Sequence, residues 1–519
     1  MENYNITIFD KVRNRINRLT DFGKPQEKFL NAIISEFHQS EQRKNMLIAQ
    51  AYYNNKNEIN DRIRTYIDRE GSLSEAKNLS NTKLAHPFMR KLTNQKVNYL
   101  LSKNFSVQVD DDDFAEILAS KYFNKKFLKM LKNVGRDSIV NGIAWVQVYY
   151  DHLGNLKFKR IPSEEVIAFW GDSDHTILEA VLRVYAITQY QVDGLKKEII
   201  KVEYHTVDGV WYYEKTDDGL KVDVDKGYEV RGHFIISQEI TNEEGNTLTD
   251  NEGNLLTEDI EATWNKVPFV PFKYNADEVS LMTWIKSLVD DYDINTSDTS
   301  NNLQDVPNSI KVVKNYDGTD KGEFTQNLAV YRTAFVSGDG DMHSLETKLD
   351  IGAINGHLDR LRKDIYEAGN GVDTQELSLG NASGVALKFR YADLDNDAND
   401  MANEFAASIE ELMWFIKVDL LNKGVGDYTD SDYEVIFNTD NITNELEAIE
   451  GAEKSVGVIS DETIVANHPW VTDPQRELNR LKKEKEAKLK EYLMSLDDEP
   501  DYGTDEPNRE PEEEIIDDE

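Results

Sequence analysis

The apolar positions in the second half of the chain follow a helical spacing in two long stretches. In the first stretch the steps between apolar residues alternate between three and four, which is a heptad pattern. Its apolar positions are Ile351, Ile354, Leu358, Leu361, Ile365 and Ala368. The apolar positions of the second stretch are Leu394, Ala398, Met401, Phe405, Ile409, Leu412, Ile416 and Leu420. We predict helices over 351–370 and 385–422, the second about 57 Å long at about 1.5 Å per residue.

A polar segment separates these two predicted helices. Gly369, Asn370 and Gly371 end the first helix, because residues of these types tolerate a positive φ. The stretch VDTQELSLGNASG follows, and we predict a polar loop over 371–384. A single compact domain has little use for such a long rod beside a polar loop. The pattern therefore favours a ring or tube built from several copies of the chain.

A third helix, with a polar second half, is predicted over 277–305. Apolar residues from Leu281 to Tyr292 stand at helical spacing, and the sequence NTSDTSNNLQD follows them. A polar half-helix is unusual in a domain core, so we expect it to line a channel wall. After this helix, residues 306–350 contain two strand-like stretches, SIKVVKNYDG and LAVYRTAFV.

Helices and strands are predicted in the remaining parts of the chain. The expected helical segments are Glu27–Ile67, Lys83–Leu101, Phe123–Ile139, Asn441–Ile459 and Asp473–Leu496, the last with Asp473 as its N-cap. The expected strands are FSVQV, the hairpin of IAWVQVYY and LKFKRI, then AVLRVYAI, IIKVEYHTV, VWYYEK, LKVDV, VPFVPFKY and YEVIF. This mixture of elements indicates an α+β fold.

The chain is strongly acidic, with a net charge of 59 − 97 = −38. This charge excludes a protein that coats DNA generally. The charge is uneven, because residues 1–100 carry 17 − 11 = +6, whereas residues 497–519 hold 13 acids and the single base Arg509. We predict that 497–519 is a disordered acidic tail.

Several features that the sequence lacks restrict the class of protein. The 519 residues include no cysteine, so disulfides, thiol nucleophiles and cysteine-ligated zinc are excluded. No window holds the roughly 18 consecutive apolar residues of a membrane span, and the N-terminus does not resemble a signal peptide. We expect a protein made in the cytoplasm that does not associate with a membrane.

Motifs for catalysis or cofactor binding are not found either. The sequence has no G-x-x-x-x-G-K-[ST] loop, no G-x-G-x-x-G after a strand, no G-x-S-x-G elbow and no H-E-x-x-H pair. We predict no catalytic residue, no metal site and no cofactor. The alternative is a metal-dependent nuclease or nucleotidyltransferase that uses clusters of aspartates.

Three clusters of acids are candidates for that alternative. They are Asp110–Asp113, Asp291-x-Asp293-x-Asn295, and the run of Asp393, Asp395, Asp397 and Asp400. The first stands where acids interact favourably with a helix start. The second lacks the glycine and the glutamate of a calcium loop, because Thr296 and Asn302 occupy those positions. The third is typical of a solvated helix face, so capping and solvation are favoured over metal binding.

Arg360, Arg362 and Lys363 lie on the polar face of the helix that begins at residue 351. In a ring, each of these charges would repeat at one height along the axis. There it would contact DNA phosphates without sequence preference. The alternative is that the three residues form salt bridges with Asp359, Asp364 or neighbouring rods.

Five segments of the chain, taken in order, resemble a known family. They are NTKLAHPFMRKLTNQKVNYLLSKNFSV, NGIAWVQVYYDHLGNLKFKRIPSEEVIAFW, VPFVPFKYN, LVDDYDINTSDTSNNLQD and SGVALKFRYADLD. Their order resembles the portal proteins of tailed bacteriophages, of the SPP-one-like type from long-tailed phages of Gram-positive hosts. The resemblance covers most of residues 80–475. The acidic tail and the Asn/Gly-rich duplication over 242–259 fall outside it.

The resemblance implies a portal fold made of named parts. These are a wing (1–276), stem helices (277–305 and 351–370), a clip (306–350), a tunnel loop (371–384), a long spine helix with a returning wing strand (385–440), a helical crown (441–496) and the acidic tail (497–519).

The resemblance also implies a function and a set of partners. A ring of copies, expected to be a dodecamer, would sit at one capsid vertex and conduct double-stranded DNA during packaging and ejection. Its partners would be the terminase large subunit, head–tail adaptor proteins, and the major capsid and scaffolding proteins. The protein would be found in the virion and, during assembly, in the host cytoplasm. A minor capsid or scaffold-binding protein without a channel is the remaining alternative.

Within this scheme the polar loop would approach DNA. Its side chains offer hydrogen bonds without binding phosphate firmly. The residues concerned are Thr374, Gln375, Ser378, Asn381 and Ser383.

Overall fold

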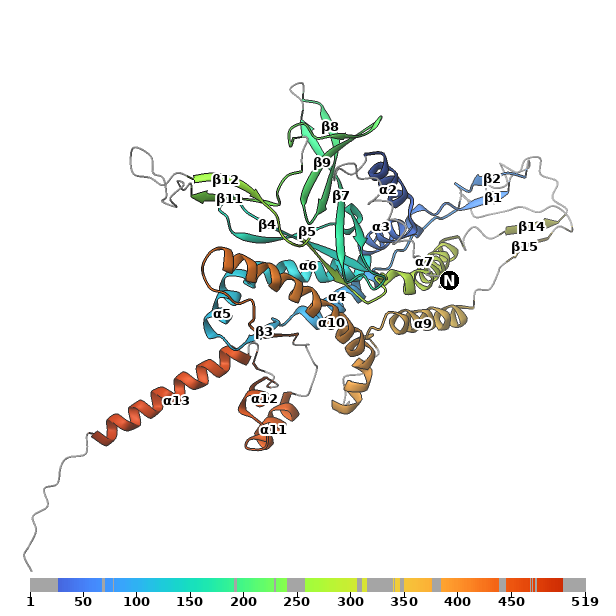
Figure 1. Cartoon of the computed structure of the whole chain (residues 1–519). Helices are drawn as coiled ribbons and strands as arrows, with labels where there is room; N and C mark the ends of the chain where they lie inside the picture. Colours follow the sequence, from blue (N-terminus) through green and yellow to red (C-terminus); the bar gives the residue numbers. More distant parts are fainter. Residues whose placement is uncertain are drawn as a thin grey trace, which may run out of the picture. The chain divides into compact units, whose positions relative to one another are not determined.

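The computed structural model divides the chain into two compact units, Met1–Thr443 and Asn444–Glu519 (Figure 1). It describes residues 27–67, 71–77, 79–190, 194–227, 230–239, 257–305, 310–314, 339, 341–345, 350–375, 384–437, 445–466, 468, 470–471 and 474–497.

The first unit begins with helices that are shorter than predicted. They are α2 (Glu27–Gln39), α3 (Glu41–Tyr53) and α4 (Phe88–Leu101). The helical prediction to Ile67 is wrong beyond Tyr53, because Asn55 takes a positive φ of 58° there. The chain then forms a short η1 turn (Glu58–Asp61) and a strand pair, β1 (Thr65–Ile67) with β2 (Leu73–Glu75). The predicted start at Lys83 is also wrong, because Pro87 disfavours helix at the residue before it.

A five-stranded antiparallel sheet follows the order β10-β9-β8-β7-β6. Its strands are β6 (Val166–Trp170), β7 (Leu178–Tyr190), β8 (Lys196–Thr206), β9 (Gly209–Thr216) and β10 (Gly219–Val222). Four of these were predicted, whereas β6, with the sequence VIAFW, was not. Helix α2 packs against this sheet, and its Leu30 and Ile34 belong to the same buried cluster as Val202 and Tyr204.

A second, three-stranded sheet has the order β13-β4-β5. The predicted hairpin is confirmed as β4 (Ile143–Tyr150) and β5 (Leu156–Ile161), which pair from Trp145↔Ile161 to Tyr150↔Leu156. The third strand is β13 (Phe269–Lys273). Helix α6 (Lys125–Asn141) packs on β4, β5 and β13, so the largest apolar core lies around this sheet.

Short elements join these layers. Strand β3 (Ser106–Val109) precedes α5 (Asp112–Ile117) and the single π-helical turn η2 (Leu118–Tyr122). A 3₁₀ turn, η3 (Ser163–Glu165), precedes β6, and β11 (Phe234–Glu239) pairs with β12 (Thr257–Ala262). The tip of the duplicated Asn/Gly-rich segment lies outside the described residues.

Helices α7 (Met282–Asp305) and α9 (Ile351–Ala368) lie side by side (Figure 1). Between them in sequence, β14 (Ile310–Lys314) pairs with β15 (Asp341–Leu345). The predicted strand LAVYRTAFV lies outside the described residues.

The long helix predicted from Val385 is confirmed as α10, which spans Gly384–Asn422. It packs against β13 and α4. After α10 the chain forms β16 (Tyr433–Ile436), the predicted strand YEVIF. This strand pairs with β3 in a sheet of two strands.

The second unit contains three helices in its described part. They are α11 (Glu445–Ser455), α12 (Asp461–Ala466) and α13 (Pro474–Asp497). Helix α12 was not predicted, and it packs on α13 with an ion pair between Asp461 and Lys485 (3.4 Å). The predicted N-cap Asp473 and the tail after Asp497 lie outside the described residues.

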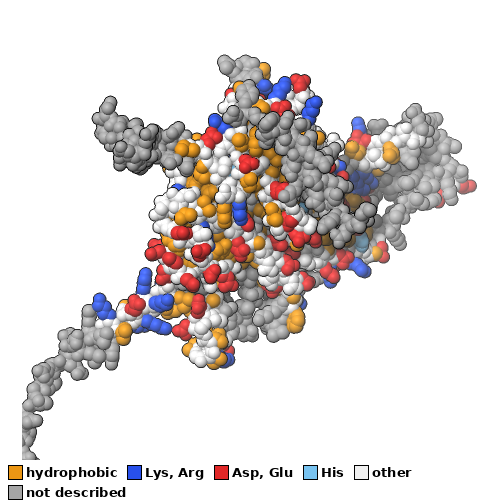
Figure 2. All heavy atoms as spheres, viewed as in Figure 1, with side chains coloured by type: hydrophobic (Ala, Val, Ile, Leu, Met, Phe, Trp, Pro, Cys, Tyr) orange, Lys and Arg blue, Asp and Glu red, His pale blue; other side chains and the backbone are white. Residues whose placement is uncertain are grey.

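The surface reflects the composition of the chain. Figure 2 shows Asp and Glu side chains spread over one face, with Lys and Arg between them. Among the described residues, no helix combines the length and the apolar character that crossing a membrane requires.

One side of the polar second half of α7 is covered by an extended segment, residues 80–86, which we call the strap. Asp293, Ser297 and Asn301 on α7 are each exposed by 1% or less. Alternate backbone N–H groups of the strap donate hydrogen bonds to α7 side chains four residues apart. The pairs are His86 to Asp293 (3.0 Å), Leu84 to Ser297 (2.9 Å), Thr82 to Asn301 (2.6 Å) and Ser80 to Asp305 (3.1 Å).

The spacing of the donors along the strap matches the spacing of the acceptors along α7 for a geometric reason. Four residues of α-helix rise about 6.0 Å, and two residues of extended chain rise about 6.2–6.8 Å. Each step along the strap therefore meets the next acceptor on the helix. Our prediction that this polar half lines a channel wall is wrong for Ser297 and Asn301, which the strap covers.

The strap contacts lead to a test with two serines of α7. Ser297→Ala removes a buried hydroxyl and leaves the partly buried N–H of Leu84 without its acceptor, so we expect the free energy of unfolding to fall by about 1–3 kcal/mol. Hydrogen exchange at the Leu84 amide should accelerate in the same variant. Ser300→Ala is the matched control, because the Ser300 hydroxyl accepts only an exposed hydrogen bond from Gln304. Equal losses of stability in the two variants would contradict the burial assigned to the strap.

Candidate functional site

The base of the 371–384 loop is built where the end of α9 meets α4. Any side chain at Gly369 or Gly371 would collide with Leu92 of α4. A Cβ atom on Gly369 would lie 2.7 Å from the Leu92 Cδ1 atom, and a Cβ atom on Gly371 would lie 2.2 Å from the Leu92 Cδ2 atom. Asn370, between them, has a φ of 46°. The sequence Gly-Asn-Gly therefore ends the helix, as predicted, and it also lets the main chain approach α4 closely.

Gln95 of α4 fixes the first residue after this turn. Its side-chain amide donates to the carbonyl of Val372 (3.1 Å) and accepts from the N–H of Val372 (3.0 Å). Val372 itself is buried beside Tyr99 and Leu394. One side chain thus satisfies both main-chain groups of the residue at which the loop begins.

Arg362 of α9 fixes the next residue, Asp373. The guanidinium donates two hydrogen bonds to the carboxylate, at 2.5 Å from Nε and 2.9 Å from Nη2. Arg362 holds the pKa of Asp373 below its usual value, and Asp373 in turn raises the pKa of Arg362. The Asp373 carboxylate also accepts from the backbone N–H of Gln375 (3.0 Å), so it orders the first turn of the loop.

Lys96 of α4 joins the two ends of the loop. Its side chain is 1% exposed, and its ammonium donates to Asp397 of α10 (2.7 Å) and to the carbonyl of Asn370 (3.2 Å). Tyr274 donates its hydroxyl to the other oxygen of Asp397 (2.7 Å). Burial lowers the pKa of the Lys96 ammonium, and Asp397 opposes that shift.

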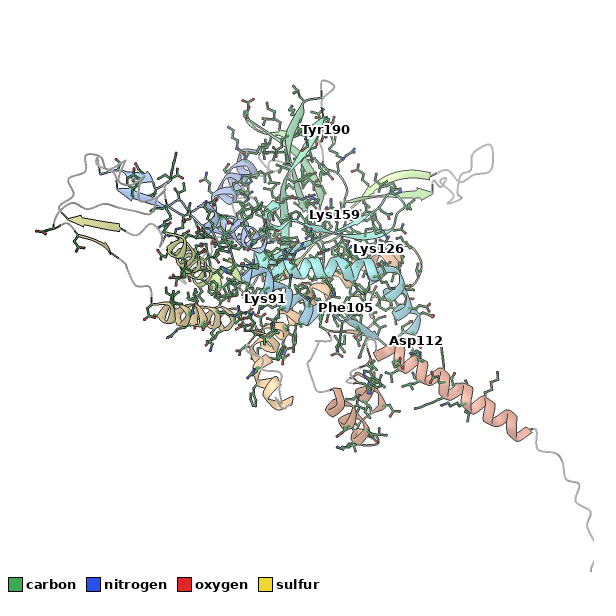
Figure 3. The ribbon with its side chains drawn as sticks, turned by 180° about the vertical axis from the view of Figure 1, so that it is seen from behind. Lys91, Phe105, Asp112, Lys126, Lys159 and Tyr190 are labelled. Carbon is green, nitrogen blue, oxygen red and sulfur yellow. The ribbon has the colours of Figure 1, made fainter. Side chains whose placement is uncertain are left out.

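Tyr99, one turn further along α4, contacts the same end of α10. Its hydroxyl donates to Asp395, and its ring stacks on Tyr391 with 6.4 Å between centroids. Figure 3, where Lys91 marks α4, shows this helix beside α9 and the start of α10. A single helix therefore holds the chain on both sides of the loop.

The residues predicted to face DNA fall into four groups. The Arg360 side chain is 81% exposed, and its Nε lies 3.8 Å from the Asp364 carboxylate, so this ion pair is long and open to solvent. Lys363 is also exposed. Arg362 is committed to Asp373 instead. Thr374 and Gln375 are exposed in the turn after Asp373. Ser378, Asn381 and Ser383 lie outside the described residues.

The aspartate clusters considered for a nuclease are engaged in other contacts. Asp111 caps α5 by accepting from the N–H of Phe114, Asp291 pairs with His357 (3.2 Å), and Asp293 is buried under the strap. In the part of the chain that the structure describes, no group of three or more His, Asp or Glu residues could hold a metal ion. The nuclease alternative has no support from this arrangement.

Sequence reasoning missed the residues that build the base of the loop. Gln95, Lys96 and Tyr99 were assigned only to a helix, and Asp373 only to a polar stretch. One signal was present, because Lys96 stands four residues after Leu92 and four residues before Leu100, on the apolar face of the helix. A charged side chain on such a face has to find a buried partner, but the sequence does not say which.

The pairing of Arg362 with Asp373 leads to a test by limited proteolysis. Arg362→Ala should free the start of the loop, so we expect cleavage after Glu376 by a Glu-specific protease to become about fivefold faster. Arg362→Lys should give an intermediate rate, because an ammonium cannot make the bidentate contact. Arg360→Ala is the matched control, and its cleavage rate should stay within about twofold of the wild type. Faster cleavage in Arg360→Ala than in Arg362→Ala would count against the role given to Arg362.

Comparisons with known proteins give a consistent result over nearly the whole chain. A family model described as "Phage portal protein, SPP1 Gp6-like" matches residues 34–491. The chain is 28% identical over 500 residues to the portal protein of Bacillus phage SPP1, across 94% of this chain and 93% of that protein. It is 29% identical over 458 residues to the portal protein of Clostridium phage phiCD119, across 86% of this chain and 93% of that protein.

Proposed function

The chain belongs to the SPP1 Gp6-like family of phage portal proteins, and from this membership we propose how its parts serve a portal. Phage portal proteins are structural components of the virion at a capsid vertex. In our proposal, copies of this chain close into a ring, a dodecamer, around an axial channel. Double-stranded DNA passes through the channel during packaging and ejection, without sequence-specific contacts.

The proposal rests on one observation, which is that α4 holds both ends of the 371–384 loop. Gln95 binds the chain before the loop at Val372, while Lys96 and Tyr99 bind α10 after it. A loop with a rigid base and a polar tip suits a constriction that DNA slides past. The base keeps its position under load, while the tip makes hydrogen bonds that break readily. We assign the tip to Thr374, Gln375, Ser378, Asn381 and Ser383.

The three basic residues of α9 receive two different roles. We propose that Arg360 and Lys363 face the channel and contact phosphates transiently. We assign Arg362 to the base of the loop, because its guanidinium is already bound to Asp373. The acidic excess of the chain supports a conduit, since a wall of like charge discourages DNA from adhering.

The remaining parts are assigned by the same proposal. Residues 1–276 form the wing, 277–305 and 351–370 the stem, 306–350 the clip, and 441–496 the crown. The long helix α10 and strand β16 form the spine and the returning wing strand of 385–440. In this scheme the clip meets the terminase large subunit and later the head–tail adaptors. The wing and crown meet capsid and scaffolding proteins.

Shortening the loop tests the channel assignment. Deletion of Thr374–Asn381 should leave ring assembly unchanged, because every contact of α4 with residues 370, 372, 395 and 397 is retained. DNA packaging or retention should fall by at least about tenfold. Ring assembly is measured by native mass spectrometry and by class averages viewed down the axis, and packaging by protection of DNA from nuclease.

A matched deletion separates the loop from a general effect of shortening the chain. Removal of Asn242–Asp250, one unit of the duplicated Asn/Gly-rich segment, should leave both assembly and packaging unchanged. Failure of the Thr374–Asn381 deletion to assemble would contradict a tunnel role for the loop. A wild-type chain that never forms a ring with an axial hole would contradict the whole proposal.

A further inference from the structure

One region of this acidic chain has the opposite charge. Residues 121–160 contain nine Lys and Arg and two Asp, a balance of 9 − 2 = +7. The other residues contain 59 − 9 = 50 bases and 97 − 2 = 95 acids, a balance of −45. The channel proposal does not use this basic region.

The basic side chains of the region gather on two packed elements, α6 and β5. Phe127 of α6 contacts Phe158 of β5 with 5.4 Å between ring centroids, and Arg160 of β5 pairs with Asp137 of α6 at 2.6 Å. Figure 3 labels Lys126 on α6 and Lys159 on β5. We use the name α6/β5 basic face for the lysines on the two sides of this sheet, which are Lys125, Lys126, Lys129 and Lys132 on the α6 side and Lys157 and Lys159 on the other side.

None of the six lysines of this face forms an ion pair within 4.0 Å among the residues that the structure describes. Lys157 and Lys159 interact with Asp151 and Glu165 only at longer range. The arginines beside them differ, because Arg136 and Arg160 both pair with Asp137. The face therefore keeps its cations available in a chain that has a large excess of acids.

The positions of Lys125 and Lys126 are unfavourable for the helix itself. They occupy the first turn of α6, where the helix dipole favours anions, and that turn contains no acid. Solvation alone gives no reason to place two cations at the N-terminus of α6. Binding of an anionic partner would give such a reason.

Strand β5 supplies the second half of the face. It is the outer strand of the sheet β13-β4-β5, and no described strand pairs with its outer edge. Because side chains alternate along a strand, Phe158 and Arg160 point toward α6, whereas Lys157 and Lys159 point to the opposite side of the sheet. Lysines on an edge strand commonly prevent aggregation, but that role does not explain the lysines of α6.

We propose that the α6/β5 basic face docks an extended acidic segment of a partner protein, which adds as a strand to the outer edge of β5. Side chains of an added strand point alternately to the two sides of the sheet. Lysines of α6 stand on one side, and Lys157 and Lys159 on the other, so acids on both sides of the segment find cations. Duplex DNA fits this face less well, because it has no main-chain amides to pair with a strand edge.

Binding of two fluorescein-labelled peptides to the full-length chain tests the proposal by fluorescence anisotropy. One peptide repeats Glu-Glu-Thr-Thr about three times, which puts Glu on both sides of a strand. The other replaces Thr by Pro, which keeps the charge but prevents strand pairing. At about 100 mM salt we expect the first peptide to bind at least about fivefold more tightly than the second.

Charge reversal locates the binding site. The double variant Lys126→Glu with Lys129→Glu should weaken binding of the first peptide at least about tenfold. The double variant Lys482→Glu with Lys483→Glu on α13 makes the same change of charge on another basic helix, and it should weaken binding less than about twofold. Such a pattern would support the proposal whether or not the chain forms a channel.

Any of five results would overturn the proposal, four of them in the binding assays. They are failure of the first peptide to bind, equal binding of the two peptides, equal weakening by the two double variants, and tighter binding of a short DNA duplex that is lost in Lys126→Glu with Lys129→Glu. A change of oligomeric state in that variant, measured by native mass spectrometry, would also overturn it, because the face would then be a contact between copies.

Discussion

The ion pair between Lys96 and Asp397 is the contact on which the geometry around the loop depends. Both charges are shielded from water, so each needs the other, and each needs one further hydrogen bond. Lys96 donates to the Asn370 carbonyl, and Asp397 accepts from the Tyr274 hydroxyl. A buried pair of this kind is stable only in one arrangement of the surrounding elements. It therefore fixes α4, α10, the end of α9 and the strand before α7 relative to one another. Apolar packing alone would tolerate small displacements of these elements relative to one another.

The strap also depends on polar groups that satisfy one another away from water, but here the donors are neutral main-chain N–H groups. Four main-chain N–H groups of residues 80–86 would be costly to bury alone, and so would the polar half of α7. Packed together they satisfy each other, because the helix and the extended chain have nearly equal periods. This interaction places a segment far away in sequence along the full polar half of α7. It also leaves the opposite side of α7 to pack against α9.

Much of the fold could be predicted from local patterns. The heptad stripe from Ile351, the Gly-Asn-Gly stop and the length of α10 all follow from spacing and residue type, and the structure contains each of them. Strand β6 was missed because its sequence, VIAFW, is only five residues long and does not alternate. The base of the loop could not be predicted, because Gln95 and Val372 lie 277 residues apart and no local pattern links them. For Arg362 the sequence offered Asp359 and Asp364, whereas the structure pairs it with Asp373 across the end of the helix.

By itself, the sequence determined where the long helices and most of the long strands lie, which faces are apolar, and that the chain carries no thiol and a large excess of acid. These properties follow from local spacing and from composition, so none of them depends on which segments meet in the fold. Only the tertiary structure decided which polar groups are buried, because burial depends on the element that arrives from elsewhere in the chain. The polar half of α7 illustrates this, since the sequence predicted a channel wall and the strap buries Ser297 and Asn301 on one side of it. The physical reason is that a hydrogen bond satisfies a polar group as well as water does, and the partner is supplied by the fold.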